Sequence, residues 1–277
     1  MPNNELTIGN VKITSLSDGH LEFDVCNFFP DVPKESWVGL ESHLSPVGNL
    51  NMNLACYLIR SEGHTIAVDT GMGPKTTPDL AWGELLNEFD SHGIRPEEVD
   101  MVVLTHAHLD HIGWNLVSRD GKYTPTFPNA TYYMSTKEWE DCHNPELVEK
   151  RFAKAPESLW PLEELGIIQL VDGEHPLTGE VRTLPTPGHT LGHISLVISS
   201  EGAGGLVLGD ALHNTAQIEN TDWVSFADMD PEQTRATRRN LMEWCEREGI
   251  SVAAVHMAAP GFGKIVRMNG RRDWQAI

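Results

Sequence analysis

The sequence predicts an α/β protein in which short strands alternate with amphipathic helices. Several short segments are apolar or alternate apolar with polar residues, and Gly, Pro or Asp bounds them, as is usual for β-strands. A long segment near the C-terminus has the period of an amphipathic helix. Candidate metal ligands follow the ends of several predicted strands. Strands and helices interspersed in this way fit β-sheets that are covered by helices.

The predicted strands are recognised by their apolar or alternating pattern and by the turn residues around them. They lie at residues 11–16, 54–59, 65–68, 101–104, 131–134, 181–184, 194–198, 205–208 and 252–255.

The predicted helices have apolar residues at helical spacing. They lie at residues 79–92, 135–143, 145–165 and 231–248. The third helix should break near Pro156 and Pro161, because proline disrupts a helix interior. The last helix has the clearest ends: Asp230 can cap it, Pro231 suits its first position and Gly249 can terminate it.

The most informative segment is residues 105–114, which reads Thr-His-Ala-His-Leu-Asp-His-Ile-Gly-Trp. It directly follows a predicted strand. His106 and His108 are two residues apart, so in an extended chain they project to the same side. Asp110 and His111 come after the chain has begun to turn, so they can point to a second position. One short loop can therefore offer ligands to two metal ions.

Three further candidate ligands follow later strands. His189 lies in a Gly/Pro turn, Asp210 follows the strand 205–208, and His256 follows the strand 252–255. A strand that passes into a loop is the usual place for a site on a rigid scaffold. Together with the first loop, these residues are enough to complete two metal sites.

The ligand types restrict the metal. Imidazole and carboxylate without thiolate favour zinc, iron, cobalt or manganese. Divalent zinc is expected first because it is a Lewis acid that needs no redox chemistry, with Fe, Mn or Co as alternatives. Two such ions about 3.5–4 Å apart can share a hydroxide. The expected ligands of one ion are His106, His108 and His189, those of the other are Asp110, His111 and His256, and Asp210 bridges the two.

The ligand pattern resembles that of the metallo-beta-lactamase superfamily over nearly the whole chain. Residues 106–111 match its His-x-His-x-Asp-His signature, and residues 68–71 match the strand-turn motif that precedes it. His189, Asp210 and His256 follow in the right order. The resemblance implies the metallo-beta-lactamase fold, a four-layer αββα sandwich, formed by one domain over residues 1–277. It also implies that Asp69 orients a ligating imidazole.

Within that superfamily, the chain looks most like the branch that holds acyl-homoserine lactone lactonases and methyl parathion hydrolase. A β-lactamase of the common subclass would carry Cys in place of Asp210, and a flavodiiron protein would carry Glu in place of His108. The segments that carry the resemblance to the lactonase branch are 16–19, 113–115, 125–130, 209–213 and 259–263.

The resemblance implies a hydrolase in which a metal-bridging hydroxide opens a lactone, of the quorum-quenching acyl-homoserine lactone type, or a related carboxylic ester. Asp210 and Asp110 are the catalytic candidates: Asp210 bridges the ions, and either Asp110 or a metal-bound water protonates the leaving alkoxide. A phosphotriesterase of the methyl parathion hydrolase type is the main alternative. A non-hydrolytic metal-binding or redox protein is the third hypothesis, and the intact ligand set and the missing flavin or iron–sulfur motifs count against it.

Residues 21–53 form the least regular segment, and it is rich in aromatic residues and proline. One interpretation is a flap that shapes an apolar substrate pocket, and the other is a homodimer contact or a cover for the core. His213 is close to Asp210 in the sequence, and Trp114 follows the first ligand loop, although Trp114 fits core packing equally well. The pocket candidates are Phe28, Phe29, Trp37, Trp114 and His213.

The composition restricts the classes of binding partner and the cellular location that we expect. The chain has 40 acidic and 20 basic residues and a formal net charge of −20, so nucleic acid is a poor partner. Four cysteines without a CxxC pair indicate free thiols in a reducing compartment. The sequence shows neither a signal peptide nor an apolar run as long as a membrane span. We therefore expect a cytoplasmic enzyme that acts on a small-molecule ester or lactone, without a membrane partner.

Overall fold

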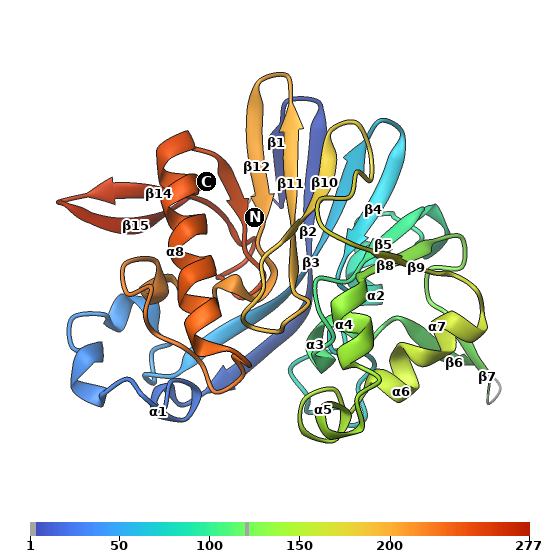
Figure 1. Ribbon diagram of the computed structural model, residues 1–277, viewed down its shortest axis with the longest axis horizontal. Coiled ribbons are helices and arrows are strands. Elements are labelled where there is room, and N and C mark those ends of the chain that lie inside the picture. The colour runs from blue at the N-terminus through green and yellow to red at the C-terminus, as the bar shows by residue number, and fades with distance from the viewer. Residues whose placement is uncertain (1–3, 120–121) are drawn as a thin grey trace.

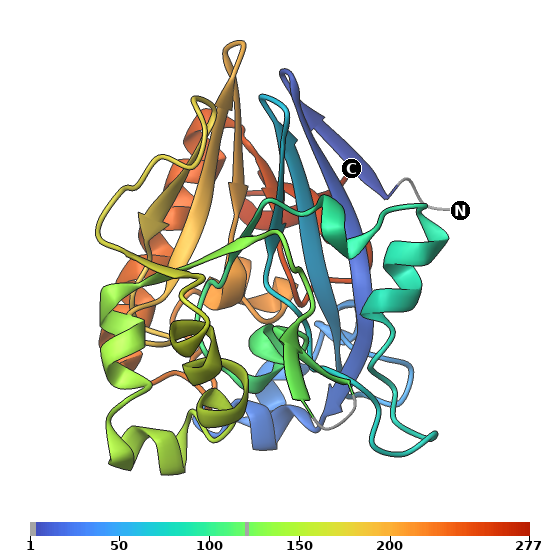
Figure 2. The same cartoon turned by 90° about the vertical axis from the view of Figure 1, so that its right-hand side faces the viewer.

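Two β-sheets pack face to face in the computed structural model, and helices cover both outer faces (Figure 1). The structure describes residues 4–119 and 122–277. The predicted four-layer αββα arrangement is confirmed. In the view turned by 90°, the two sheets again lie side by side (Figure 2).

The first sheet has the strand order β1-β2-β3-β4-β5-β8-β9. Strands β1 to β4 pair antiparallel, whereas β4, β5, β8 and β9 pair parallel. A separate hairpin is formed by β6 (Leu116–Arg119) and β7 (Lys122–Pro125). The strands of the first sheet are β1 (Glu5–Ile8), β2 (Val11–Phe23), β3 (Leu50–Ser61), β4 (His64–Val68), β5 (Met101–Val103), β8 (Thr131–Ser135) and β9 (Ile168–Val171).

The second sheet has the strand order β10-β11-β12-β13-β14-β15. Its one parallel pair, β12 with β13, is connected through α8 (Pro231–Glu248), and the other neighbours are antiparallel. Its strands are β10 (Val181–Pro185), β11 (Ile194–Ser200), β12 (Ala203–Val207), β13 (Ser251–Ala253), β14 (Phe262–Met268) and β15 (Arg271–Ala276).

Helix α8 begins and ends as the sequence predicts. The Asp230 side chain accepts a hydrogen bond from the backbone N–H of Gln233, and Pro231 occupies the first helical position. Gly249 ends the helix with a φ of 61°, a left-handed conformation that glycine adopts without a steric penalty. The remaining helices are α1 (Val25–Phe28), α2 (Leu85–Ser91), α3 (Leu109–Ile112), α4 (Thr136–Asp141), α5 (Pro145–Lys150), α6 (Ala155–Ser158) and α7 (Trp160–Glu164).

Several predicted boundaries need correction. The helix expected at 145–165 is three short helices, and Pro156 and Pro161 lie in the first turns of α6 and α7, so each break comes before its proline. The helix expected at 79–92 begins only at Leu85. Strands β1, β6, β7, β9, β14 and β15 were not predicted.

The irregular segment is shorter than the sequence suggests. Strand β2 continues to Phe23 and β3 already begins at Leu50, because the two strands go on pairing beyond a register shift between Ser17 and His20. The irregular part is therefore residues 24–49. It contains α1 and two single turns of 3₁₀-helix, at Lys34–Trp37 and Glu41–His43.

The core has a layer on each side of each sheet. Along β3, Ala55, Tyr57 and Ile59 belong to the cluster between the two sheets, whereas Cys56 and Leu58 belong to the cluster beneath the helices of the first sheet. This alternation is the two-residue period of a strand that is buried on both faces. Helix α8 packs Leu241, Met242 and Cys245 on the outer face of the second sheet.

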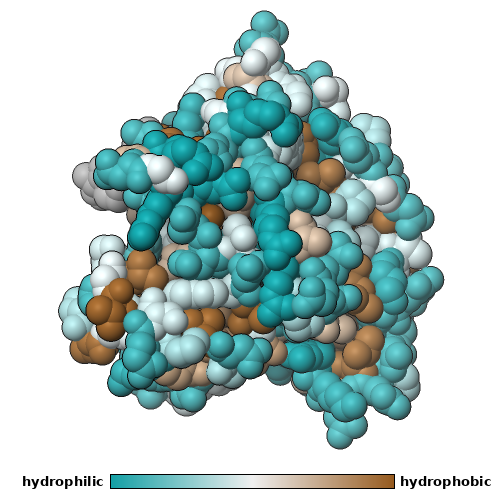
Figure 3. Space-filling view, turned by 60° about the vertical axis from the view of Figure 1, so that its left-hand side comes forward, coloured by the Kyte–Doolittle hydropathy of each residue, from teal (hydrophilic) through white to brown (hydrophobic). Residues whose placement is uncertain are grey.

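The surface on the side of α8 and the β14–β15 hairpin is mostly hydrophilic, and its hydrophobic residues form small separate patches (Figure 3). All four cysteines carry free thiols. Within residues 4–119 and 122–277, no helix combines the length and the hydropathy needed to cross a bilayer.

Candidate metal centre

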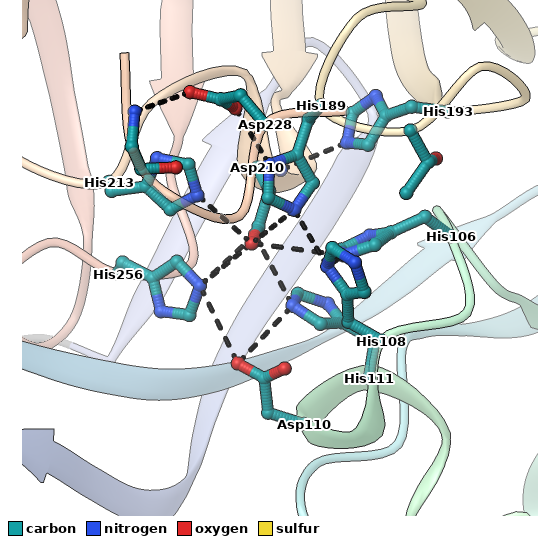
Figure 4. Close-up of polar contacts among 12 residues, drawn as sticks. His106, His108, Asp110, His111, His189, His193, Asp210, His213, Asp228 and His256 are labelled. Atoms are coloured by element: carbon teal, nitrogen blue, oxygen red, sulfur yellow. Dashed lines mark hydrogen bonds and ion pairs between the residues drawn. The ribbon is translucent and has the colours of Figure 1, made fainter. Parts of the chain in front are cut away.

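All of the predicted ligands meet at one end of the two sheets, where several strands pass into loops (Figure 4). His106 and His108 lie between β5 and α3, and α3 itself carries Asp110 and His111. His189 lies between β10 and β11. The last two come from the turns after β12 and β13: Asp210 in the 3₁₀ turn Gly209–Ala211, and His256 just beyond Ala253.

The first ligand group is His106, His108 and His189. Nδ1 of His108 lies 3.1 Å from Nε2 of His106 and 2.8 Å from Nε2 of His189. The ligand atoms of all three lie within 4.8 Å of one another. Three imidazole nitrogens that converge in this way can hold one divalent ion.

The second ligand group is Asp110, His111 and His256, whose ligand atoms likewise lie within 4.8 Å of one another. Oδ2 of Asp110 lies 3.6 Å from Nε2 of His111 and 3.8 Å from Nε2 of His256. This group lies beside the first one, since the rings of His106 and His111 are 4.0 Å apart between centroids.

Asp210 lies between the two groups. Its Oδ2 is 3.3 Å from Nε2 of His189 and 3.8 Å from Nε2 of His106. Its Oδ1 is 3.3 Å from Nε2 of His111, and Nε2 of His256 lies 3.1 Å from each of the two oxygens. One carboxylate thus faces both ligand groups, which is the position that the sequence predicts for a bridging ligand.

The donor atoms fit metal ions. Nε2 of His111 and Oδ1 of Asp210 are buried without a hydrogen-bond partner among the described residues. Unpartnered buried polar atoms are unfavourable, and a cation between them would satisfy both. The outer nitrogens of two ligand rings are already engaged: Nδ1 of His256 donates to the carbonyl of Asn53, and Nδ1 of His106 lies 3.0 Å from Oγ1 of Thr105. The inner Nε2 lone pair of each ring is therefore available for a metal.

Two buried carboxylates orient one ring in each group. Asp69 Oδ2 lies 2.8 Å from Nδ1 of His111, as predicted, and Asp228 Oδ1 lies 2.9 Å from Nδ1 of His189. His193 supports the bridging residue rather than joining a ligand group, because its Nε2 accepts the backbone N–H of Asp210 at 2.9 Å.

The two ligand groups differ in electrostatic environment. Burial and the neighbouring His111 lower the pKa of His106 well below its usual value, and burial with the adjacent His189 does the same for His108. Burial also opposes the charged form of His111, but the charge of Asp210 and two other carboxylates outweighs it and raises the His111 pKa well above its usual value. Asp110 and Asp69 thus act on His111 of the second group, whereas Asp228 pairs with His189 of the first group.

A pocket of about 220 Å³ opens onto the ligands. Of the pocket candidates, Phe28 and His213 line it. The His213 ring stacks on His256 with centroids 5.7 Å apart, and its Nε2 lies 3.4 Å from Oδ2 of Asp210. The other lining side chains, apart from the ligands, are mainly apolar, with two cations among them: Leu21, Phe23, Met52, Met72, Leu109, Phe226, Ala227, Lys150 and Arg151.

Phe29, Trp37 and Trp114 do not line this pocket, which corrects their assignment. Phe29 is fully buried and packs against Trp37, with ring centroids 5.7 Å apart, in a cluster beneath the 24–49 segment. Trp114 points into the core, where its indole N–H donates to Oδ1 of Asp18 at 2.9 Å. Phe28 and Phe29 are neighbours in the chain, yet only Phe28 faces the ligands.

Sequence reasoning missed Asp228 and Glu138. Asp228 lies in a loop 39 residues beyond His189, and no motif marks it. Glu138 is fully buried in α4. Burial raises the pKa of its carboxyl group to about 7, although the hydrogen bonds from Thr190 and Ala107 act in the opposite direction. The one available signal was the Ser-x-x-Glu pattern of Ser135 and Glu138, which marks a helix start but not its neighbours.

A model of the metallo-beta-lactamase superfamily matches residues 53–243, well over half of the chain. The chain belongs to that superfamily. The predicted family and fold are confirmed, and the matched region contains every predicted ligand except His256.

Relatives in the metallo-beta-lactamase superfamily support the lactonase branch. An N-acyl homoserine lactonase of Bacillus thuringiensis is 28% identical over 231 residues, which cover 76% of this chain and 83% of the relative. The solved structure of AidC, a dizinc quorum-quenching lactonase, has a TM-score of 0.85 at 22% identity and shows the shared fold, covering 99% of this chain and 96% of its own. The hydrolase AbOPH, of the beta lactamase superfamily, has a TM-score of 0.82 at 25% identity, over 99% of this chain and 96% of its own. The chain is thus a metal-dependent hydrolase, as the sequence predicts.

Proposed function

We propose that this protein is a dinuclear metal-dependent lactonase that opens the ring of an N-acyl homoserine lactone or a related carboxylic ester. The observation that carries the proposal is the position of Asp210, whose two oxygens face two complete ligand groups. The lactonases among the relatives supply the substrate class.

The metal ligands would be the two groups described above with Asp210 between them. We expect zinc, because imidazole and carboxylate suit it and hydrolysis needs no redox change. When bound, such ions would supply a water whose pKa is lowered to about 7 and would polarise the ester carbonyl.

The chain's own residues then orient the reaction. Asp69 and Asp228 hold the Nδ1 atoms of His111 and His189, which leaves the Nε2 atom of each ring to hold a metal ion. Asp110 and Asp210 both line the pocket, and the Asp110 side chain is the more exposed of the two. Its carboxylate could take up the proton that the attacking water loses and pass it to the departing alkoxide. His213 lines the same pocket, where its ring could hydrogen-bond to a substrate oxygen, and its Nε2 also lies 3.4 Å from Oδ2 of Asp210.

The pocket walls fit the non-reacting part of such a substrate. Phe28, Phe23 and Phe226 form a group with ring centroids 5.1 to 6.3 Å apart, and all three line the pocket. An acyl chain that packs against these rings leaves water, which favours binding by about 25 cal/mol for each Å² of apolar surface buried.

A substrate panel tests the proposal. Purified protein is assayed with acyl-homoserine lactones, γ-lactones, aryl esters, paraoxon and nitrocefin, and its metal content is measured by elemental analysis without added metal. We expect ring-opened N-acyl homoserine as the product and close to two transition-metal ions per chain. Efficient turnover of paraoxon without lactone turnover would instead identify a phosphotriesterase, and no turnover of any substrate by the two-metal protein would favour a non-hydrolytic role.

We also propose that residues 1–277 act as one hydrolase domain. We further propose that the chain forms a homodimer through the outer side of the 24–49 segment. Phe28 belongs to the pocket wall, whereas Val38 and Val47 are 79% and 75% exposed. Substituting both valines by Asp should shift the sedimentation profile toward monomer if this side is the contact. An unchanged profile would leave the segment with its pocket role alone.

A further inference from the structure

Glu138 connects the two loops that supply the first ligand group. Its Oε1 accepts the backbone N–H of Ala107 at 2.9 Å, and Ala107 lies between His106 and His108. Its Oε2 accepts the hydroxyl of Thr190 at 2.7 Å, and Thr190 directly follows His189. The same oxygen accepts the backbone N–H of Gly192 at 3.2 Å.

Helix α4 contacts the second of these loops at one further point. Oγ of Ser135 donates to the carbonyl of Gly192 at 2.5 Å and accepts the backbone N–H of Glu138 at 3.1 Å. A Cβ atom at Gly192 would lie 2.2 Å from the backbone nitrogen of Glu138, so only glycine permits this approach. The loop after His189 is therefore held against the start of α4 through both its N–H and its C=O groups.

The bonding pattern requires a carboxylate at this position. All three partners of Glu138 donate, and its side chain is fully buried. A carboxylate can accept at both oxygens, whereas the amide of a glutamine presents one oxygen and one N–H₂ group. In a glutamine variant, the amide nitrogen would face donors on one of the two loops.

We propose that Glu138 is a positioning residue that fixes His106, His108 and His189 at the spacing that one metal ion needs. The inference rests on the proposed two-metal site. It goes beyond that function because Glu138 touches neither a ligand side chain nor the pocket, and acts through the backbone between and after the ligands.

The effect should be selective for one of the two ions. The second ligand group is held by other partners, since Asp69 orients His111 and the Asn53 carbonyl orients His256. Loss of a partner that orients metal ligands typically lowers metal affinity about 10- to 100-fold. We therefore expect Glu138→Gln to weaken the binding of one ion by this factor and leave the other unchanged.

The test is a titration of metal-free protein with Zn²⁺ in competition with a chromogenic chelator, which resolves two dissociation constants. Glu138→Gln is compared with Asp141→Asn. Asp141 is also a buried carboxylate of α4, but its ion pair is with Lys137 on the same helix. The control should bind both ions as the wild type does.

Thr190→Val provides a milder variant if Glu138→Gln fails to fold. It removes one of the three hydrogen bonds at nearly constant volume, so a smaller loss at the same single ion is expected. Substitution of Co²⁺ adds a spectroscopic readout, because the visible absorption of the first ligand group should change in both variants.

Equal weakening of both ions, or unchanged affinities in a folded Glu138→Gln protein, would overturn the inference and leave Glu138 a purely structural residue. Failure of the proposed function is recognised separately. In that case the wild-type protein itself would bind fewer than two ions or open no lactone.

Discussion

Asp69 and His111 form a buried pair in which the carboxylate Oδ2 lies 2.8 Å from the imidazole Nδ1. Asp69 has a φ of 60°, an uncommon conformation for a residue other than glycine, and its carboxylate also accepts hydrogen bonds from the N–H and hydroxyl of Thr105. Asp69 therefore holds the chain at Thr105, just after β5, and at the same time fixes the orientation of the His111 ring.

Replacing Asp69 by Asn should weaken one metal ion selectively. The amide keeps the shape, but it lacks the charge that favours the Nδ1–H form of His111. We expect about 10- to 100-fold weaker binding at the second ligand group, measured by chelator competition. Asp228→Asn is the matched variant at His189 and should weaken the first group instead, so the same ion lost in both variants would contradict the assignment.

Replacing Asp210 by Asn should remove one ion and most of the activity. The carboxylate faces both ligand groups, so loss of its charge leaves two cations without the shared negative partner between them. Elemental analysis should give about one ion per chain, and kcat should fall by at least about 100-fold, as is typical when an electrostatic stabiliser of the transition state is lost. Wild-type turnover by a variant that still holds two ions would refute the bridging role.

Phe28 and Phe29 should respond differently to truncation. Phe28→Ala removes a pocket wall, so KM for long acyl substrates should rise about ten- to a hundredfold, equivalent to about 1.5–3 kcal/mol of apolar contact, with little change for short ones. Phe29→Ala empties a fully buried position and should lower the free energy of unfolding by about 3–5 kcal/mol without changing chain-length preference.

Steady-state kinetics over a series of acyl lengths and urea unfolding separate these two effects. Metal content serves as the control and should stay constant in both variants. A loss of chain-length preference in Phe29→Ala at unchanged stability would reverse the two roles.

Asp18 should make stability depend on pH. Burial raises its pKa to about 6 from 3.8, although N–H groups of Leu85, Trp114, Met72 and Gly73 donate to it. Because the folded state holds the proton more tightly, the stabilising contribution is present below about pH 4 and is lost as the pH rises through 6. The free energy of unfolding should change by about 3 kcal/mol in total, because each tenfold difference in proton affinity between the folded and unfolded states corresponds to about 1.4 kcal/mol.

Urea unfolding of the wild type and of Asp18→Asn, from about pH 4 to about pH 7, measures this contribution. Asn does not titrate, so the difference between the two free energies of unfolding isolates Asp18 from the many histidines. The wild type should lose stability relative to the variant as the pH rises. A constant difference across this range would show that Asp18 stays ionised throughout.

The ligand set could be predicted because the spacing of the ligands along the sequence identifies them. The spacing of His106, His108, Asp110 and His111 fixes which side chains share a side of one loop, and the other ligands each follow a recognisable strand end. The αββα architecture could be predicted for the same reason: strand and helix periods are local, and the family motif connects them. Segments whose apolar residues follow no clear period, such as the β14–β15 hairpin, could not be predicted. Their pairing depends on the edge of the sheet that β13 presents.

The sequence by itself thus determined the superfamily, the layered fold and the residues that can hold metal. Only the tertiary structure decided that Phe28 faces the pocket while Phe29 and Trp37 face the core, and that Trp114 bonds to Asp18. It also decided that Asp228 and Glu138 support ligand loops 39 and 31 residues away in the chain. The physical reason is that metal chemistry restricts residue type and local spacing, whereas pocket walls and supporting hydrogen bonds need only the right side chain at the right place in space.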